Sequence, residues 1–183
     1  MAKIIGFFQS RAVRDRRFTE LVRPHLDAMH RMAYRWAQNS EDAEDLVQET
    51  LSKVVDRVEE MEKVEKLGPW LIRILYRCFV DSRRKRSRSA GQNESDWHGD
   101  LDVFDEKVLN IREINRIGRL ELQRDLIKAL ETLNHDQRDI VLLHDTEGYS
   151  ASEIASILDI SLGTVKSRLH RARTQLKNFL GTF

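Results

Sequence analysis

The sequence predicts an all-α protein in which two small helical domains are joined by a flexible linker. Only 2 prolines and 8 glycines occur among 183 residues, and the alternating runs of β-branched side chains that indicate strands are almost absent. Apolar side chains recur at helical spacing along most of the chain. This length suits one large domain or two small ones, and a hydrophobic fraction of 40% is enough to fill their cores.

The first helices are predicted within residues 15–38 and 41–61. Apolar side chains keep a helical period through the first of these segments, and Pro24 divides it or forms the first turn of a second helix. Acidic residues after Asn39 indicate a new helix start, because they interact favourably with a helix N-terminus. The helix at 41–61 leaves polar side chains facing outward, namely Asp45, Gln48, Glu49, Ser52 and Asp56.

A basic helix is predicted to open at residues 67–70 and to end near residue 84. Its cations include Arg73, Arg77, Arg83 and Arg84. Trp70 and Tyr76 interleave with them, and bases can stack on aromatic rings in a cationic groove. Two interpretations stay open. The basic run at 83–88 is as often a solvated tail as a nucleic-acid contact, and Trp70 and Phe79 also fit a core, which leaves Tyr76 as the better candidate for an exposed ring.

The predicted domain boundaries follow from composition. Residues 1–88 form the first domain, and residues 89–118 are small, polar and acidic without a sustained period, which is typical of a linker. The second domain occupies residues 119–183. Net charge is only +1, but the charges are segregated along the chain, and this segregation is the informative feature.

The second domain opens with two predicted helices. Leucines at helical spacing indicate a helix at 119–133. Asn134, with Gln137 three residues later, is predicted to cap the next helix at 135–146, and Gly148 ends it. This helix supplies apolar side chains that pack beneath the segment that follows.

The stretch from Gly148 to Leu176 predicts a helix-turn-helix. Ser150 and Glu153 form a capping box, in which each side chain closes one free amide at a helix start. A second helix begins at Ser161, a good N-cap residue. Its polar side chains fall away from an apolar stripe, and they are Lys166, Ser167, His170, Arg171 and Thr174.

The second helix of this motif is basic on its polar side. Residues 160–183 contain five Lys or Arg and no Asp or Glu. Such a face suits a recognition helix, because cations bind phosphates while Ser, Lys and Arg reach base edges in the major groove. A basic face is often merely solvated. Here the capping box, short link, apolar stripe and single sign of charge coincide, which favours DNA contact.

Other classes of function are not indicated. The single Cys78 excludes an internal disulfide and suits a reducing cytosol. No apolar run approaches the ~20 residues of a membrane span. The six histidines form no two-His-plus-carboxylate pattern, and no phosphate loop or paired-carboxylate site occurs. We therefore expect a cytoplasmic protein without metal, cofactor, catalytic activity or membrane insertion.

The two helical units and their order resemble the extracytoplasmic-function sigma factors, alternative sigma factors of the sigma-70 family in bacteria. Three stretches carry the resemblance, which covers nearly the whole chain: Asp42-Ala43-Glu44-Asp45-Leu46-Val47-Gln48-Glu49-Thr50, Pro69-Trp70-Leu71 with Ile74, and Gly148–Arg173. The resemblance implies a subunit of RNA polymerase without enzyme activity of its own. It also implies promoter DNA and core polymerase as partners, and an anti-sigma factor as a further one.

The resemblance assigns a contact to each segment. Residues 1–88 would form sigma region 2, docked on the clamp helices of the largest subunit through Asp45, Gln48, Glu49 and Ser52. The minus-10 element would meet Trp70, Arg73, Tyr76, Arg77, Arg83 and Arg84. Residues 119–183 would form region 4, which meets the polymerase flap. It would read the minus-35 element through Lys166, Ser167, His170 and Arg171, with Arg138 on the DNA backbone.

One residue departs from the family pattern. Arg77 stands where similar proteins usually carry an Asn that helps to hold a flipped base. The resemblance therefore leaves the identity of the minus-10 bases open. The alternative is a free-standing helix-turn-helix regulator of the response-regulator type, which shares the motif at 150–166. Its receiver domain would alternate strands and helices, and residues 1–90 carry no strand signal.

Overall fold

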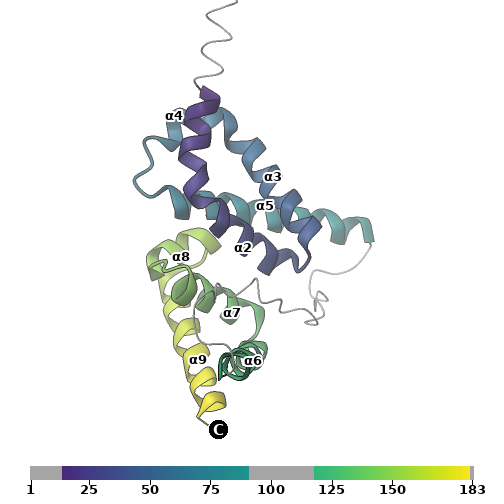
Figure 1. Ribbon diagram of the computed structural model, residues 1–183, viewed down its shortest axis with the longest axis vertical. Helices are drawn as coiled ribbons and strands as arrows, with labels where there is room; N and C mark the ends of the chain where they lie inside the picture. The colour runs from purple at the N-terminus through teal and green to yellow at the C-terminus, as the bar shows by residue number, and fades with distance from the viewer. Residues whose placement is uncertain (1–13, 91–117, 182–183) are drawn as a thin grey trace, which may run out of the picture. The chain divides into compact units, whose positions relative to one another are not determined.

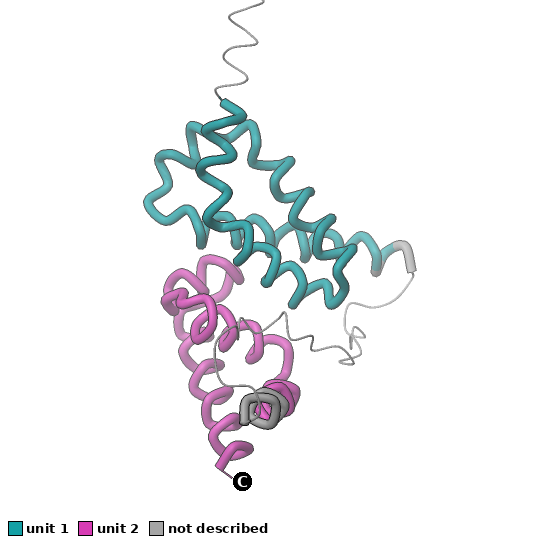
Figure 2. The backbone as a smooth tube through the Cα atoms, viewed as in Figure 1, with its two compact units in different colours: residues 1–97 teal, residues 98–183 magenta. Residues whose placement is uncertain are grey.

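The computed structural model describes residues 14–90 and 118–181. All regular elements in these two ranges are helical (Figure 1), which confirms the predicted all-α class. The chain divides into two compact units, residues 1–97 and residues 98–183 (Figure 2). Because residues 14–90 contain no strand, this part of unit 1 lacks the alternation that a receiver domain requires.

Unit 1 is a bundle of helices in which α2 packs against both α3 and α5. Its elements are a first helix at residues 14–22, the 3-10 turn η1 (Arg23–His25), α2 (Leu26–Ala37), α3 (Ser40–Val54), the 3-10 turn η2 (Val55–Arg57), α4 (Val58–Met61) and α5 (Leu67–Ala90). Pro24 lies in η1 and separates the first helix from α2, as predicted. Asn39 caps α3, since its side chain accepts the N–H of Asp42 at 2.7 Å.

The core of unit 1 lies where α2, α3 and α5 meet, and α4 adds Met61 to it. Its fully buried side chains include Met29, Met32, Val47, Met61, Leu71, Ile72 and Leu75. Burying one side chain of this size contributes about 1.5–3 kcal/mol relative to leaving it in water. The outward positions predicted for α3 are confirmed for Asp45, Gln48 and Ser52, which are exposed, while Glu49 is half-buried.

Two predicted boundaries in unit 1 are wrong. The helix expected at 41–61 is interrupted by η2, because the chain tightens to a 3-10 turn between α3 and α4. The helix expected to end near residue 84 continues to Ala90. Arg86 donates to Asp42 Oδ2 at 2.8 Å, so the extra turns of α5 are tied to the first turn of α3.

Unit 2 is built around α9, which contacts α6, α7 and α8. Its elements are α6 (Gly118–Glu131), α7 (His135–Val141), the π turn η4 (Leu142–Thr146), α8 (Ala151–Leu158) and α9 (Leu162–Leu180). The capping boxes predicted at Asn134 and Ser150 are both present. The helix predicted at 135–146 ends instead in the π turn, where the Glu147 N–H reaches back to the Leu142 carbonyl at 3.1 Å.

The apolar stripe predicted for α9 faces the core of unit 2. Val165 and Ala172 are fully buried and Leu169 is 8% exposed. The other buried side chains of unit 2 include Ile140, Leu143, Ile154 and Ile157, together with Leu133 in the turn after α6. Within the described ranges, each helix is too short or too polar to cross a membrane.

Candidate nucleic-acid and polymerase interfaces

A tight turn joins α8 to α9. Asp159 ends α8 in the left-handed conformation (φ 57°), and the Ile160 N–H donates to the Ala155 carbonyl at 3.1 Å. Ser161 then caps α9, because its Oγ accepts the N–H of Thr164 at 3.0 Å. The turn therefore leaves α9 held firmly on unit 2 with its polar side turned to solvent.

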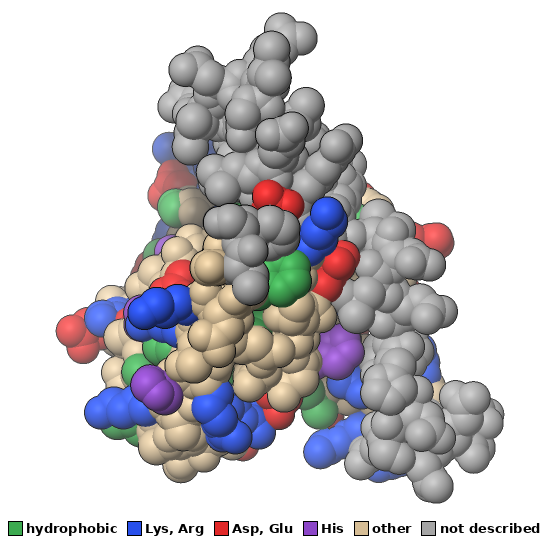
Figure 3. All heavy atoms as spheres, turned by 90° about the horizontal axis from the view of Figure 1, so that it is seen from below, with side chains coloured by type: hydrophobic (Ala, Val, Ile, Leu, Met, Phe, Trp, Pro, Cys, Tyr) green, Lys and Arg blue, Asp and Glu red, His purple; other side chains and the backbone are tan. Residues whose placement is uncertain are grey.

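The predicted recognition side chains lie together on the outer face of α9. Lys166, Ser167, His170 and Arg171 are all exposed. Arg171 folds back along its own helix, where its Nε donates to the Ser167 carbonyl at 3.3 Å. Side chains of both charge signs are exposed elsewhere on the molecule (Figure 3), whereas the α9 sequence contains no carboxylate. This face therefore attracts anions without an opposing charge on the same helix.

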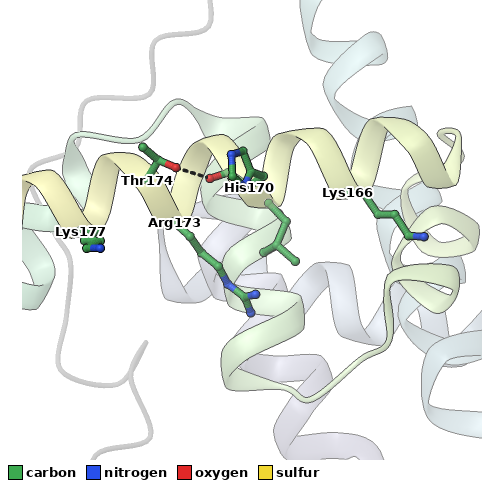
Figure 4. Close-up of a pocket in the computed structure, with 6 residues that line it drawn as sticks. Lys166, His170, Arg173, Thr174 and Lys177 are labelled. Atoms are coloured by element: carbon green, nitrogen blue, oxygen red, sulfur yellow. Dashed lines mark hydrogen bonds between the residues drawn. The ribbon is translucent and has the colours of Figure 1, made fainter.

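A shallow groove runs along α9 beside these residues (Figure 4). Its volume is about 320 Å³, and it is lined by Lys166, Leu169, His170, Arg173, Thr174 and Lys177. Three of these residues, Arg173, Thr174 and Lys177, are not among the predicted DNA contacts. The signal for two of them was present, because Lys166, His170, Arg173 and Lys177 repeat the 4-3-4 spacing of the apolar stripe one residue later.

Arg173 is held by the π turn η4. Its Nη2 donates to Asp145 Oδ1, and it also lies 3.2 Å from His144 Nδ1. Burial opposes ionisation of Asp145, but the hydrogen bonds from Arg173 and His144 outweigh it, so the pKa of this carboxyl is below its usual value. The cluster fixes the orientation of Arg173 at the edge of the groove.

Two aromatic rings of α5, Tyr76 and Phe79, form a cluster with a buried ring of α2. Trp36 of α2 lies 5.2 Å from the Tyr76 ring and 5.8 Å from the Phe79 ring. The Arg83 guanidinium lies 5.6 Å above Phe79. Arg77 and Arg84 are exposed, as is Arg83, whereas Arg73 is half-buried.

The start of α5 is covered by a second arginine–aromatic pair. The Arg57 guanidinium lies 4.8 Å from the centroid of the Trp70 ring. The same guanidinium donates two hydrogen bonds, both of 2.7 Å, to the Glu60 carboxylate. One face of Trp70 is therefore occupied by Arg57, and the ring is only half-buried.

Three comparisons place the chain among known proteins. Family models match twice: sigma-70 region 2 at residues 21–89 and sigma-70 region 4 at residues 123–176. The extracytoplasmic-function sigma factor EcfG of Rhodopseudomonas palustris is 32% identical over 142 residues, which are 78% of this chain and 73% of EcfG. The chain belongs to the extracytoplasmic-function sigma factors.

Further relatives support this membership. The sigma factor SigE of Mycolicibacterium smegmatis is 38% identical over 161 residues, 88% of this chain, although the chain spans only 60% of the length of SigE. Among solved structures, the sigma factor RpoE of Bartonella quintana, in complex with the anti-sigma factor NepR, matches with a TM-score of 0.64 and 35% identity. That match covers 90% of this chain and 96% of RpoE.

In this sigma factor, Arg138 does not lie where a contact with the DNA backbone was expected. The side chain is 5% exposed, so it does not project from the surface as a DNA-backbone contact would. Its guanidinium donates to the carbonyls of Leu130 at 3.0 Å and Leu133 at 2.9 Å. Burial lowers the pKa of this guanidinium, whose charge is directed into the end of α6. We therefore remove Arg138 from the candidate DNA contacts.

The expectation that Tyr76 carries an exposed ring is also wrong. The ring is half-buried between Trp36 and Phe79 and is not the exposed ring of the cluster. The sigma factor holds no group of three or more metal-binding side chains within the part of the chain that the structure describes.

Proposed function

We propose that the chain binds core RNA polymerase and directs transcription initiation at promoters that it selects. The observation that carries this proposal is the pairing of two surfaces in one family member: a helix-turn-helix whose outer face is cationic, and a separate unit that matches region 2. A helix of this kind enters the major groove with its side chains against base edges. We propose no enzyme activity for the chain and place it in the cytoplasm with the polymerase.

We assign minus-35 recognition to α9. Lys166, Ser167, His170 and Arg171 are exposed on one helix face, and Arg173 and Lys177 extend the cationic stripe toward the end of the helix. Lys and Arg supply both base contacts and phosphate contacts. Arg173 is paired with Asp145, and this pair fixes its position beside the groove.

We assign minus-10 recognition to α5 and the loop before it. Trp70, Arg73, Arg77, Arg83 and Arg84 lie on this segment, and Tyr76 supports it from within the ring cluster. Stacking on an aromatic ring contributes about 1–3 kcal/mol per base. Arg77 is exposed in place of the Asn of similar proteins, so we propose a phosphate or stacking contact for it.

We assign polymerase docking to the outer face of α3. Asp45, Gln48 and Ser52 are exposed there, and Glu49 pairs with Lys53 at 2.7 Å. A compact acidic face of this kind selects a cationic partner and speeds the encounter with it. Similarity to RpoE, which is bound by NepR, supports an anti-sigma factor as a further partner of this chain.

The experiment that tests this function is run-off transcription from a promoter library with purified core polymerase, with and without the chain. Transcripts that arise only in its presence support the proposal, and alignment of their upstream regions gives the two promoter elements. If no transcript depends on the chain while it still shifts duplex DNA alone, the regulator alternative replaces it.

A further inference from the structure

The loop between α4 and α5 comprises residues 62–66 (Figure 1). Charged side chains attach it to its surroundings. Its first residues close against α4, since the N–H groups of Glu62 and Lys63 donate to the carbonyls of Val58 and Glu60, each at 3.0 Å. The rest of the loop leads directly to Leu67, the first residue of α5. The position of the loop therefore depends on the residue that binds the Glu62 side chain.

Glu62 is held by Arg17 of the first helix. Arg17 Nε donates to Glu62 Oε1 at 2.8 Å, and Arg17 Nη2 donates to the second carboxylate oxygen. A two-point contact between a planar guanidinium and a carboxylate fixes direction as well as distance. The same helix makes a second attachment nearby, because Arg14 pairs with Asp56 of η2 at 3.1 Å.

A second arginine spans the loop. Arg57 bonds the Glu60 carboxylate at the end of α4 and covers the Trp70 ring near the start of α5. Arg17 therefore binds the loop itself through Glu62. Arg57 connects the residues that flank the loop, Glu60 before it and Trp70 after it. Of the two, Arg17 is the one that comes from a distant part of the sequence.

The charges explain why such a contact suits a nucleic-acid site. The segment from Glu59 to Glu65 carries four carboxylates, which repel phosphates. Arg57 neutralises Glu60 and Arg17 neutralises Glu62, while Lys63 stays exposed. These pairs reduce the repulsion between the loop and a negatively charged strand.

We propose that Arg17 is a positioning residue for promoter opening: by holding Glu62, it sets the 62–66 loop against the minus-10 strand. The proposal rests on the function proposed above, in which this loop and α5 hold the minus-10 element. Arg17 itself touches no base. Its effect passes through Glu62 to the loop and to Trp70.

The test measures base discrimination at the minus-10 element with the full chain and core polymerase. A promoter found by run-off transcription is compared with versions that carry single-base changes in its minus-10 element. Arg17→Ala and Glu62→Gln should each reduce the discrimination ratio about three- to fivefold, since an exposed but well-aligned ion pair contributes up to about that factor. Affinity for core polymerase and minus-35 discrimination should stay at their wild-type values, and the thermal unfolding midpoint should fall by no more than about 4–8 °C, the shift expected when one such pair is lost from a small domain.

The matched control is Arg16→Ala. Arg16 lies on the same helix, and among the described residues it pairs with Glu20 one turn along, at 3.0 Å, so this variant should keep the wild-type ratio. The exchanged pair Arg17→Glu with Glu62→Arg should recover most of the lost discrimination. Equal ratios for Arg17→Ala and Arg16→Ala, or no recovery in the exchanged pair, would overturn the positioning role alone. A wild-type chain that supports no transcription would overturn the proposed function and this inference together.

Discussion

Arg138 Nε donates a hydrogen bond to the Leu130 carbonyl oxygen at 3.0 Å, which ties the start of α7 to the end of α6. The guanidinium also reaches the carbonyls of Glu131 at 3.5 Å and Leu133 at 2.9 Å. The last carbonyls of a helix have no partner within it, and burial makes an unpaired carbonyl costly. Arg138 thus supplies several donors at a place where water is excluded.

Arg138→Ala should destabilise unit 2 by about 2–3 kcal/mol, because it leaves buried carbonyls without a donor. Chemical denaturation of the full chain, followed by a probe in unit 2, measures the change. Arg171→Ala, which removes an exposed arginine from α9, is the control and should stay within about 0.5 kcal/mol of wild type. If Arg138→Ala is as stable as this control but binds promoter DNA less well, the backbone-contact role first expected for Arg138 is restored.

Local signals in the sequence predicted local structure well. Both capping boxes and the stripe of α9 are confirmed, because each depends on residues three or four apart whose meeting is fixed by helix geometry. The surroundings of Arg138 could not be predicted in this way. Its acceptors are main-chain carbonyls of the preceding segment, and no residue type marks them in the sequence.

Tyr76 shows that a contact between two helices could not be predicted from the pattern of one helix. Periodicity along α5 alone left its ring on the polar side. The ring that covers it, Trp36, comes from α2, some forty positions earlier in the chain, so only the tertiary fold brings the two together. The π turn η4 was missed for a related reason, since its pattern of apolar residues also fits an α-helix.

Lys166→Ala and Arg171→Ala should reduce discrimination at the minus-35 element by about 1–3 kcal/mol each. Both side chains are exposed on the outer face of α9, where a base edge can approach them. Transcription from promoters with single changes in the minus-35 element measures the loss, and affinity for core polymerase should not change. Lys177→Ala is the comparison, because a phosphate contact should weaken all promoters alike. A double variant of Lys166 and Arg171 with unaltered promoter choice would refute their role.

Asp42→Asn should destabilise unit 1 more at pH 7 than at pH 3. Hydrogen bonds from Asn39 and Arg86 hold the pKa of the Asp42 carboxyl below its usual value of 3.8. A carboxyl whose pKa is lower in the folded state contributes stability above its unfolded pKa, and this contribution is lost as pH falls through the folded pKa. Thermal unfolding across this pH range measures the difference between variant and wild type. Arg86→Ala should show part of the same pattern, whereas a difference independent of pH would contradict this account of the pair.

Reversing two charges on α3 should weaken binding to core polymerase. Asp45→Lys combined with Glu49→Lys turns an acidic face into a basic one, and like charges placed across an interface oppose association. We expect a loss of at least about tenfold in affinity, measured by titration of labelled chain with core enzyme, and a smaller loss at high salt because screening weakens the repulsion. Asp27→Lys makes the same kind of charge change at an exposed position of α2 and should bind as wild type does. Undiminished affinity in the α3 variant would show that the docking face lies elsewhere on unit 1.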